Sequence, residues 1–205
     1  MKFLFLDIDG VLNSADTIQD LGGHVSEQDW WLGMLDFDRC ELLAGLCRDL
    51  GDLRIVLSSS WRKAHTHSEM ESLICEKLGP ELAQHVEGRF VDRTGSFCGI
   101  TPRDAGGLPM GRGLEIQDWV RNMFTQPELG FETPEHAHIC IVDDDSDMGC
   151  LTPALVNTSW AKGLTAADVL DIKETLSKPL RDVGGFDGWV EDAFDYRFHH
   201  KDDEE

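Results

Sequence analysis

Basic residues are scarce in this chain of 205 residues, which has 18 Lys and Arg against 39 Asp and Glu and a formal net charge of −21. Capture of a long nucleic acid requires a basic surface, because binding displaces counterions from the phosphate backbone. The composition therefore argues against an extended nucleic-acid surface. A nucleotide or a polynucleotide end that binds at one local site is compatible with this charge.

Long apolar runs and closely spaced cysteine pairs are also missing. No apolar stretch is long enough to cross a membrane, and Asp7 and Asp9 interrupt the apolar start before a signal peptide could form. The six cysteines contain no Cys-x-x-Cys pair. We therefore expect buried thiols in a reducing compartment rather than disulfides or a zinc site. Together these absences predict a soluble, cytoplasmic protein without membrane contact.

The remaining pattern alternates short apolar runs with amphipathic stretches, which is typical of an α/β fold with parallel strands and crossover helices. The length suits one main domain, over residues 1–178, followed by a C-terminal extension with an acidic tail, over residues 179–205. The segment from Asn13 to Phe37 contains three glycines and is expected to be an irregular flap. The expected strands are Phe3–Leu6, Leu53–Leu57, Val86–Val91, His138–Val142 and Leu155–Thr158, and the expected helices are Asp38–Leu50 with Asp38 as N-cap, Ser68–Leu78, a helix that opens at Arg112, and Ala166–Leu176 with Thr165 as its cap.

Two aspartates follow the first apolar strand. Asp7 and Asp9 are separated by one residue, and Gly10 supplies a turn signal directly after them. Open α/β sheets place their ligands at the carboxyl ends of the strands. Two carboxylates at this position can hold Mg²⁺, and one can attack phosphorus while the other transfers protons. An acidic turn at the end of an ordinary strand is the alternative.

Three further polar groups stand at strand ends or helix starts. Ser58 and Ser59 follow the second strand, where hydroxyls and helix N–H groups can bind phosphoryl oxygens, although Ser59 or Ser60 is also expected to cap a helix. Arg112 opens a helix, where a cation opposes the helix dipole; a surface arginine is the alternative to a functional one. Asp143, Asp144, Asp145 and Asp147 place four carboxylates within five residues, and these would repel one another without a cation among them.

In this order the segments resemble the four motifs of the haloacid dehalogenase (HAD) superfamily. The first is D-I-D-G-V at Asp7. The resemblance implies a Rossmann-like three-layer sandwich with a mainly parallel central sheet. HAD proteins carry cap domains after the first motif or further along the chain; here the flap is too short for a large cap and residues 92–111 read as loops, so we expect no large cap domain and an open site. The resemblance also implies Asp7 as the nucleophile, Asp9 as the general acid and base, and Ser58 and Arg112 as phosphate-binding groups. It further implies that Mg²⁺ is held by Asp7, Asp9 through its backbone carbonyl, Asp143 and Asp144, with Asp147 behind them and the register of this acidic run uncertain by one residue.

Shorter strings resemble a narrower group, the HAD domains of multifunctional RNA-repair proteins called Swiss Army Knife proteins. These strings are S-S-S-W-R at residues 58–62, G-I-T-P at 99–102, R-G-L-E-I-x-x-W at 112–119 and G-L-T at 163–165. Within the first string, Arg62 is a further candidate for binding a substrate phosphate. An exposed helical arginine without such a role is the alternative.

The sequence thus predicts a Mg²⁺-dependent phosphohydrolase with an aspartyl-phosphate intermediate. Its expected partner is a phosphorylated small molecule or a nucleic-acid end, with a nucleotide or a polynucleotide end preferred. A phosphoprotein or a small metabolite is a second class of substrate. A catalytically silent module that binds phosphate or a partner is a different function altogether. Trp30 or Trp31 is expected either to pin the flap to the core, which is favoured, or to stack on a base.

Overall fold

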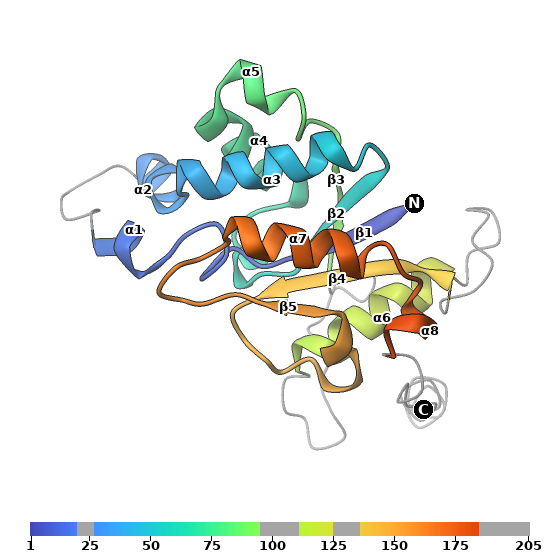
Figure 1. The fold of residues 1–205 in the computed structure, drawn as a ribbon. Coiled ribbons are helices and arrows are strands. Elements are labelled where there is room, and N and C mark those ends of the chain that lie inside the picture. The colour runs from blue at the N-terminus through green and yellow to red at the C-terminus, as the bar shows by residue number, and fades with distance from the viewer. Residues whose placement is uncertain (20–26, 95–110, 125–135, 185–205) are drawn as a thin grey trace, which may run out of the picture.

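The computed structural model describes residues 1–19, 27–94, 111–124 and 136–184, and Figure 1 shows their arrangement. The strands are β1 (Lys2–Leu6), β2 (Leu53–Leu57), β3 (Phe90–Arg93), β4 (His138–Asp143) and β5 (Leu155–Asn157). The helices are α1 (Ala15–Gln19), α2 (Glu27–Met34), α3 (Phe37–Asp49), α4 (His67–Leu78), α5 (Pro80–Ala83), α6 (Arg112–Phe124), α7 (Ala166–Thr175) and α8 (Leu180–Val183), with the 3₁₀ helices η1 (Ser60–Lys63) and η4 (Gly149–Ala154).

The five strands form one parallel sheet in the order β3-β2-β1-β4-β5. The strand β1 lies at the centre, and its residues alternate between two apolar clusters because successive side chains of a strand point to opposite faces. Leu4 and Leu6 pack in the cluster that contains α3, α4 and α7. Phe3 and Phe5 pack in the cluster that contains α6, η4 and α8.

Helices therefore cover both faces of the sheet. In Figure 1, α3 and α4 lie above the sheet, while α6 and α8 lie below it. This confirms the predicted three-layer α/β sandwich, and the described residues contain no large additional domain. The predicted division at residue 178 stays a prediction, since α8 lies beyond it and residues 185–205 lie outside the described part.

Two predicted elements are wrong in detail. The flap is not irregular throughout, because α1 and α2 form within it, and Trp31 of α2 packs against Trp61. The third strand runs over Phe90–Arg93 rather than from Val86. The chain turns just before it, where Gly88 has a φ of +72°. Such a positive φ does not fit a strand but suits a glycine in a turn.

The helix boundaries follow their caps. The N-cap of α3 is Asp36, whose side chain accepts a hydrogen bond from the Arg39 N–H, so the prediction of Asp38 was wrong by two residues. Asp38 lies in the first turn instead, where an acid is favourable. The predicted cap Thr165 is confirmed, and it forms a reciprocal capping box with Asp168.

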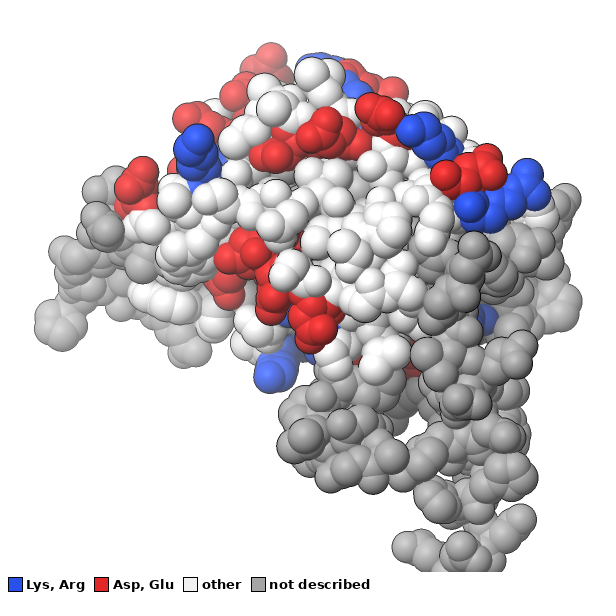
Figure 2. Space-filling model, turned by 60° about the horizontal axis from the view of Figure 1, so that its bottom comes forward, with Lys and Arg blue, Asp and Glu red and all other residues white. Residues whose placement is uncertain are grey.

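The surface charges and the cysteines can be compared with two predictions, which are the lack of an extended nucleic-acid surface and the presence of buried thiols. Figure 2 shows Asp and Glu side chains in several patches, with Lys and Arg separated from one another on the described part of that face. The cysteine thiols at positions 40, 47 and 140 are buried and free, and burial raises the pKa of the Cys40 and Cys47 thiols to about 12. Within the described ranges, no helix has the length and apolar character needed to cross a bilayer.

Candidate active site

The sheet brings three of the predicted segments together at the carboxyl ends of its central strands. Leu6 pairs with Leu57 on one side and with Val142 on the other. The next residue along each strand therefore shares the same edge, and these residues are Asp7, Ser58 and Asp143. Backbone hydrogen bonds continue this register, since the Asp7 N–H donates to Val142 and the Ser58 N–H donates to Leu6, at 3.0 and 2.8 Å.

Three carboxylates meet at this edge. Asp7, Asp143 and Asp144 each offer an oxygen, and these oxygens all lie within 4.8 Å of one another. Asp7 and Asp143 are 5% and 1% exposed, so water screens their charges poorly. Asp143 and Asp144 are the two residues of the acidic run that the sequence predicts as metal ligands, and their role as ligands stays a prediction.

The burial of these carboxylates changes their protonation. Burial raises the pKa of Asp7 to about 6, while the Arg112 guanidinium and a hydrogen bond from Ser59 act in the opposite direction. Burial, together with the charge of Asp7, raises the pKa of Asp143 to about 7. The pKa of Asp144 is also raised, chiefly by burial. The cluster carries more negative charge than its surroundings stabilise, which favours a bound cation.

The turn at Gly10 allows Asp144 to approach. Gly10 has a φ of +69°, and a Cβ at this position would lie 2.5 Å from the Asp144 carboxyl carbon. Both the positive φ and the close contact exclude a side chain there. Gly10 thus turns the chain after Asp9 and leaves room for the carboxylate of Asp144.

Arg112 is the cation beside this cluster. Its Nη1 lies 3.5 Å from Oδ1 of Asp7 and 3.6 Å from Oδ2 of Asp143. Within the described part of the chain, this buried Nη1 has no hydrogen-bond partner, and the buried Oγ of Ser58 has none either. Buried polar groups are normally hydrogen-bonded, so these two groups next to Asp7 can donate hydrogen bonds to the oxygens of a phosphate.

Asp9 stands apart from the three-carboxylate cluster. Its half-buried side chain accepts hydrogen bonds from the Trp61 indole and the Asn13 amide, at 3.1 and 3.0 Å, and a longer one from Ser60 at 3.5 Å. The sequence had assigned no role to Asn13 or Trp61. Trp61 lies within the S-S-S-W-R string, but neither residue type nor spacing predicts its contact with a carboxylate 52 positions earlier.

The remaining predicted residues surround the cluster without joining it. Ser59 is buried and caps η1, since its Oγ accepts from the Trp61 N–H at 3.3 Å, which confirms the expected capping role. The Arg62 guanidinium contacts Glu115 and the Ser59 carbonyl, so phosphate binding by Arg62 stays a prediction. Glu115 is a buried carboxylate that the sequence did not single out, although it lies one helical turn after Arg112.

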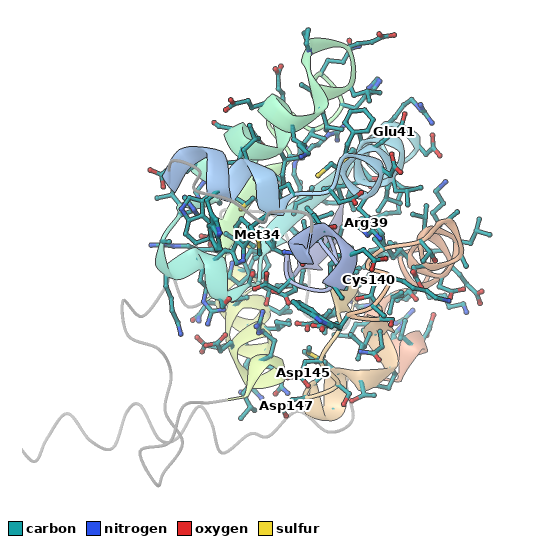
Figure 3. All side chains as sticks on the ribbon, turned by 90° about the vertical axis from the view of Figure 1, so that its left-hand side faces the viewer. Met34, Arg39, Glu41, Cys140, Asp145 and Asp147 are labelled. Atoms are coloured by element: carbon teal, nitrogen blue, oxygen red, sulfur yellow. The ribbon has the colours of Figure 1, made fainter. Side chains whose placement is uncertain are left out.

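Asp147 follows β4 in the sequence and lies next to the first turn of α6. Figure 3, which views the molecule from the left-hand side of Figure 1, places Asp147 and Asp145 near that end of the helix. The backbone carbonyl of Asp147 accepts a hydrogen bond from the Gly113 N–H at 3.2 Å. Its exposed side chain is not among the three clustered carboxylates. A supporting role behind the metal ligands stays a prediction.

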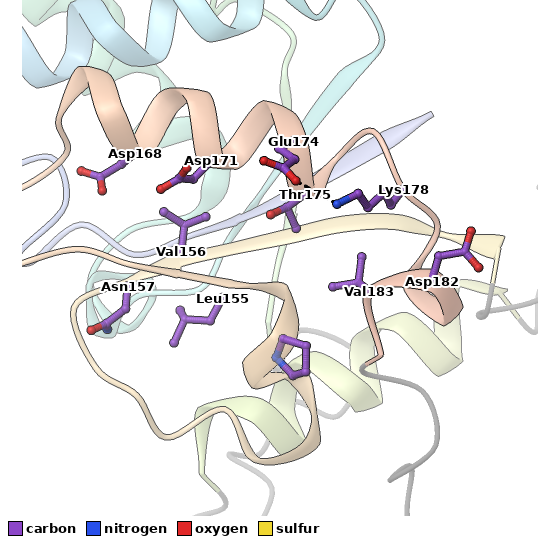
Figure 4. Close-up of a pocket in the computed structure, with 11 residues that line it drawn as sticks. Leu155, Val156, Asn157, Asp168, Asp171, Glu174, Thr175, Lys178, Asp182 and Val183 are labelled. Atoms are coloured by element: carbon purple, nitrogen blue, oxygen red, sulfur yellow. Dashed lines mark hydrogen bonds and ion pairs between the residues drawn. The ribbon is translucent and has the colours of Figure 1, made fainter.

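His136 and His138 lie at the opposite end of β4, as expected. His136 is exposed, and Nδ1 of His138 lies 3.0 Å from the Leu176 carbonyl oxygen. A separate groove of about 440 Å³ lies between α7 and β5 (Figure 4). It is lined by acidic side chains of α7, with Glu174 paired to Lys178 at 2.9 Å. None of the predicted site residues lines this groove.

An all-parallel Rossmann-like sheet with a buried acidic cluster at its carboxyl edge places the protein in the HAD class of α/β domains. Among protein-family models, that of the HAD domain in Swiss Army Knife RNA repair proteins matches residues 3–169. The match covers most of the chain, and the protein belongs to this family. It confirms the resemblance inferred from the short strings. No curated protein shows a significant match to the chain, and no solved structure does.

Proposed function

We propose that the protein is a Mg²⁺-dependent phosphohydrolase that acts through an aspartyl-phosphate on Asp7, with the phosphate of a nucleotide or a polynucleotide end as its substrate. The observation that carries this proposal is the convergence of Asp7, Asp143 and Asp144 beside the guanidinium of Arg112, whose Nη1 lies 3.5 Å from Asp7 and 3.6 Å from Asp143. Most HAD domains are phosphohydrolases, and the family match makes this reaction class the natural one for such a cluster.

The donor set fits a magnesium ion. Carboxylate oxygens are the ligands that Mg²⁺ prefers, and three lie within reach of one another. The raised pKa values of Asp7 and Asp143 reflect burial and crowding of like charges, which a divalent cation would relieve. Asp7, Asp143 and Asp144 would hold the ion, together with the backbone carbonyl of Asp9. The ion would neutralise charge on the transferring phosphoryl group.

Each proposed step uses a residue of this site. A carboxylate oxygen of Asp7 forms a bond to phosphorus while the bond to the leaving oxygen breaks, and Asp9 gives that oxygen a proton. Asp9 then takes a proton from water, whose oxygen attacks phosphorus and releases phosphate from Asp7. Arg112, Ser58 and Ser59 hold the phosphoryl oxygens during both transfers, and Arg62 is a further candidate for this role.

The proposed substrate class is supported by the charge of the protein surface, by the lack of a large cap among the described residues and by the family to which the chain belongs. On the face shown in Figure 2, the Lys and Arg side chains of the described residues form no continuous basic area of the kind that a long nucleic acid requires. The absence of a large cap among the described residues leaves room for a bulky substrate. The family name refers to RNA repair. A phosphohydrolase can process damaged RNA ends that carry a terminal phosphate.

Phosphate release from p-nitrophenyl phosphate with Mg²⁺ tests the reaction class. Asp7→Asn should abolish activity, because the amide is a poor nucleophile toward phosphorus. Asp171→Asn makes the same chemical change on the exposed surface of α7 and should leave the rate unchanged. Activity that survives Asp7→Asn would overturn the mechanism. Oligonucleotides with a 3′- or a 5′-phosphate, compared with mononucleotides, then identify the substrate.

A further inference from the structure

The indole of Trp61 makes an unusual contact with Asp9. Its Nε1 lies 3.1 Å from Oδ1 and 3.1 Å from Oδ2, so a single N–H faces both carboxylate oxygens. Trp61 is only 5% exposed. A donor in this position fixes the plane of the carboxylate, because rotation about the side-chain bond would move one oxygen away from the indole.

The indole itself is held in place by its neighbours. The ring of Trp31, which belongs to α2, lies 4.7 Å from the ring of Trp61 with an angle of 68° between the planes. His65 lies 4.7 Å from Trp31 and 6.2 Å from Trp61. Edge-to-face contacts of this kind add stability beyond the buried area. Trp61 therefore cannot turn its N–H away from Asp9 without displacing Trp31.

A second donor fixes Asp9 from within its own segment. The Nδ2 of Asn13 lies 3.0 Å from Oδ1 of Asp9, and the Oδ1 of Asn13 accepts from the Gly10 N–H at 2.8 Å. Asn13 is fully buried, and these two bonds fix which way its amide faces, because only the oxygen can accept from Gly10 and only the nitrogen can donate to Asp9. The Asp9 carboxylate is thus held between an amide from the turn after β1 and an indole from the segment after β2.

We propose that Trp61 is a positioning residue that orients Asp9 for proton transfer to the leaving oxygen. This inference rests on the proposed phosphohydrolase function. Trp61 acts through Asp9 and takes no part in the bonds that form and break. Because Trp31 holds Trp61, the helix α2 becomes part of the support of the proton-transfer group. A general acid that is misplaced by a fraction of an ångström loses much of its effect.

The leaving group provides the readout. p-Nitrophenolate is a stable anion and departs without a proton, whereas the ribose oxygen of a nucleotide must be protonated as it leaves. A defect in the orientation of Asp9 should therefore slow the transfer of the phosphoryl group from an alkyl phosphate to Asp7 much more than the transfer from p-nitrophenyl phosphate. A merely structural defect would slow both reactions equally, because it would disturb the site as a whole.

Trp61→Phe keeps the aromatic ring and removes the N–H. We compare kcat/KM, which reports the steps up to departure of the leaving group and not the later hydrolysis of the aspartyl-phosphate, in which Asp9 acts on both substrates alike. With a 3′-phosphorylated oligonucleotide we expect kcat/KM to fall about tenfold or more, and with p-nitrophenyl phosphate to change by less than about threefold. Trp160→Phe makes the same change at an exposed position and should match the wild type on both substrates. Trp31→Leu leaves the N–H but removes its support, and should give the same selectivity to a smaller degree.

A spectroscopic measurement tests the contact without any turnover. The indole N–H signal of Trp61 is identified by its absence in Trp61→Phe, and we expect it to exchange slowly with water. Asp9→Asn, which leaves Trp61 intact, should shift this signal, while Asp171→Asn should not. If Trp61→Phe fails to fold, sequential assignment of the folded wild type identifies the indole signal of Trp61, and Trp31→Leu supplies the kinetic comparison.

The outcomes separate the two proposals. An active wild type with equal losses of kcat/KM on both substrates, or with no loss in either tryptophan variant, would overturn the positioning role and leave the phosphohydrolase function standing. An unshifted indole signal in Asp9→Asn would overturn the contact itself. A wild type that hydrolyses neither substrate with Mg²⁺ would refute the proposed function, and the positioning role with it.

Discussion

Arg62 and Glu115 form a buried ion pair in which one guanidinium nitrogen lies 2.7 Å from each carboxylate oxygen. The side chains are 13% and 3% exposed. Burial lowers the pKa of Arg62, and the charge of Glu115 raises it in part. The pair joins η1, which follows Ser58 and Ser59, to α6, which begins at Arg112. One contact thus connects the two segments that we propose to bind phosphate.

Removing one partner of this pair should destabilise the protein strongly. Glu115→Ala leaves the buried Arg62 cation without its counterion, and we expect the free energy of unfolding to fall by about 3–5 kcal/mol. The double variant Arg62→Met/Glu115→Leu should recover a large part of this loss, because neither charge is then left unpaired. Urea denaturation monitored by circular dichroism measures both effects.

The control for this experiment is Glu174→Ala, which removes a partner of the exposed pair with Lys178. It should have a much smaller effect than Glu115→Ala, because water screens this pair. Similar losses in the two variants would mean that the Arg62–Glu115 pair does not hold η1 and α6 together.

The metal-free protein should lose stability as the pH rises from 5 to 8. The pKa of Asp7 is about 6 and that of Asp143 about 7, both raised from 3.8, so the folded state binds these protons more tightly than the unfolded chain. The contribution of these two carboxylates to the free energy of unfolding is complete below pH 3.8 and is lost as the pH passes through 6 and 7.

Magnesium binds the deprotonated carboxylates and should therefore raise Tm more at pH 8 than at pH 5. Thermal melts with EDTA or Mg²⁺ measure this; an equal rise at both pH values would contradict it.

Neutralising one carboxylate of the cluster should stabilise the protein without metal. Asp143→Asn removes a like charge beside Asp7, so we expect a higher Tm in EDTA at pH 8 and a much smaller rise on addition of Mg²⁺. Asp171→Asn changes the same residue type at an exposed position and should retain the full magnesium effect. A variant at position 143 that melts lower in EDTA and keeps the wild-type response to Mg²⁺ would exclude the cluster as the binding site.

Local signals predicted most of the fold and the centre of the site. The apolar runs of β1, β2 and β4 are short, continuous and ended by polar residues, so their positions follow from the sequence alone. Parallel strands then bring their carboxyl ends together, which is why Asp7, Ser58 and Asp143 were expected at one edge. The caps of α7 and η1 were likewise visible, because a cap depends on residues within one turn.

Contacts between distant segments were not predictable in this way. Trp31 of α2 packs against Trp61, and the Trp61–Asp9 and Arg62–Glu115 contacts each join residues more than 50 positions apart. Residue type alone suggested an exposed arginine or a phosphate ligand at position 62. Only the packed fold shows that a buried carboxylate on α6 occupies its guanidinium.

The start of α6 should not tolerate a side chain at Gly113. A Cβ there would lie 2.2 Å from the backbone oxygen of Met148 and 2.4 Å from its carbonyl carbon, and a backbone cannot move aside as a flexible side chain can. Gly113→Ala should therefore push α6 away from the segment after β4 and destabilise the protein by about 1–3 kcal/mol. Because Arg112 is the preceding residue, phosphate release should also fall.

The matched control is Gly45→Ala in α3, where the nearest atom would be Arg48 Nη2 at 3.8 Å. This variant should stabilise the protein by about 0.5–1 kcal/mol and leave activity unchanged. Urea denaturation and phosphate release measure both variants, and a gain in stability from Gly113→Ala would show that α6 does not depend on this close approach to Met148.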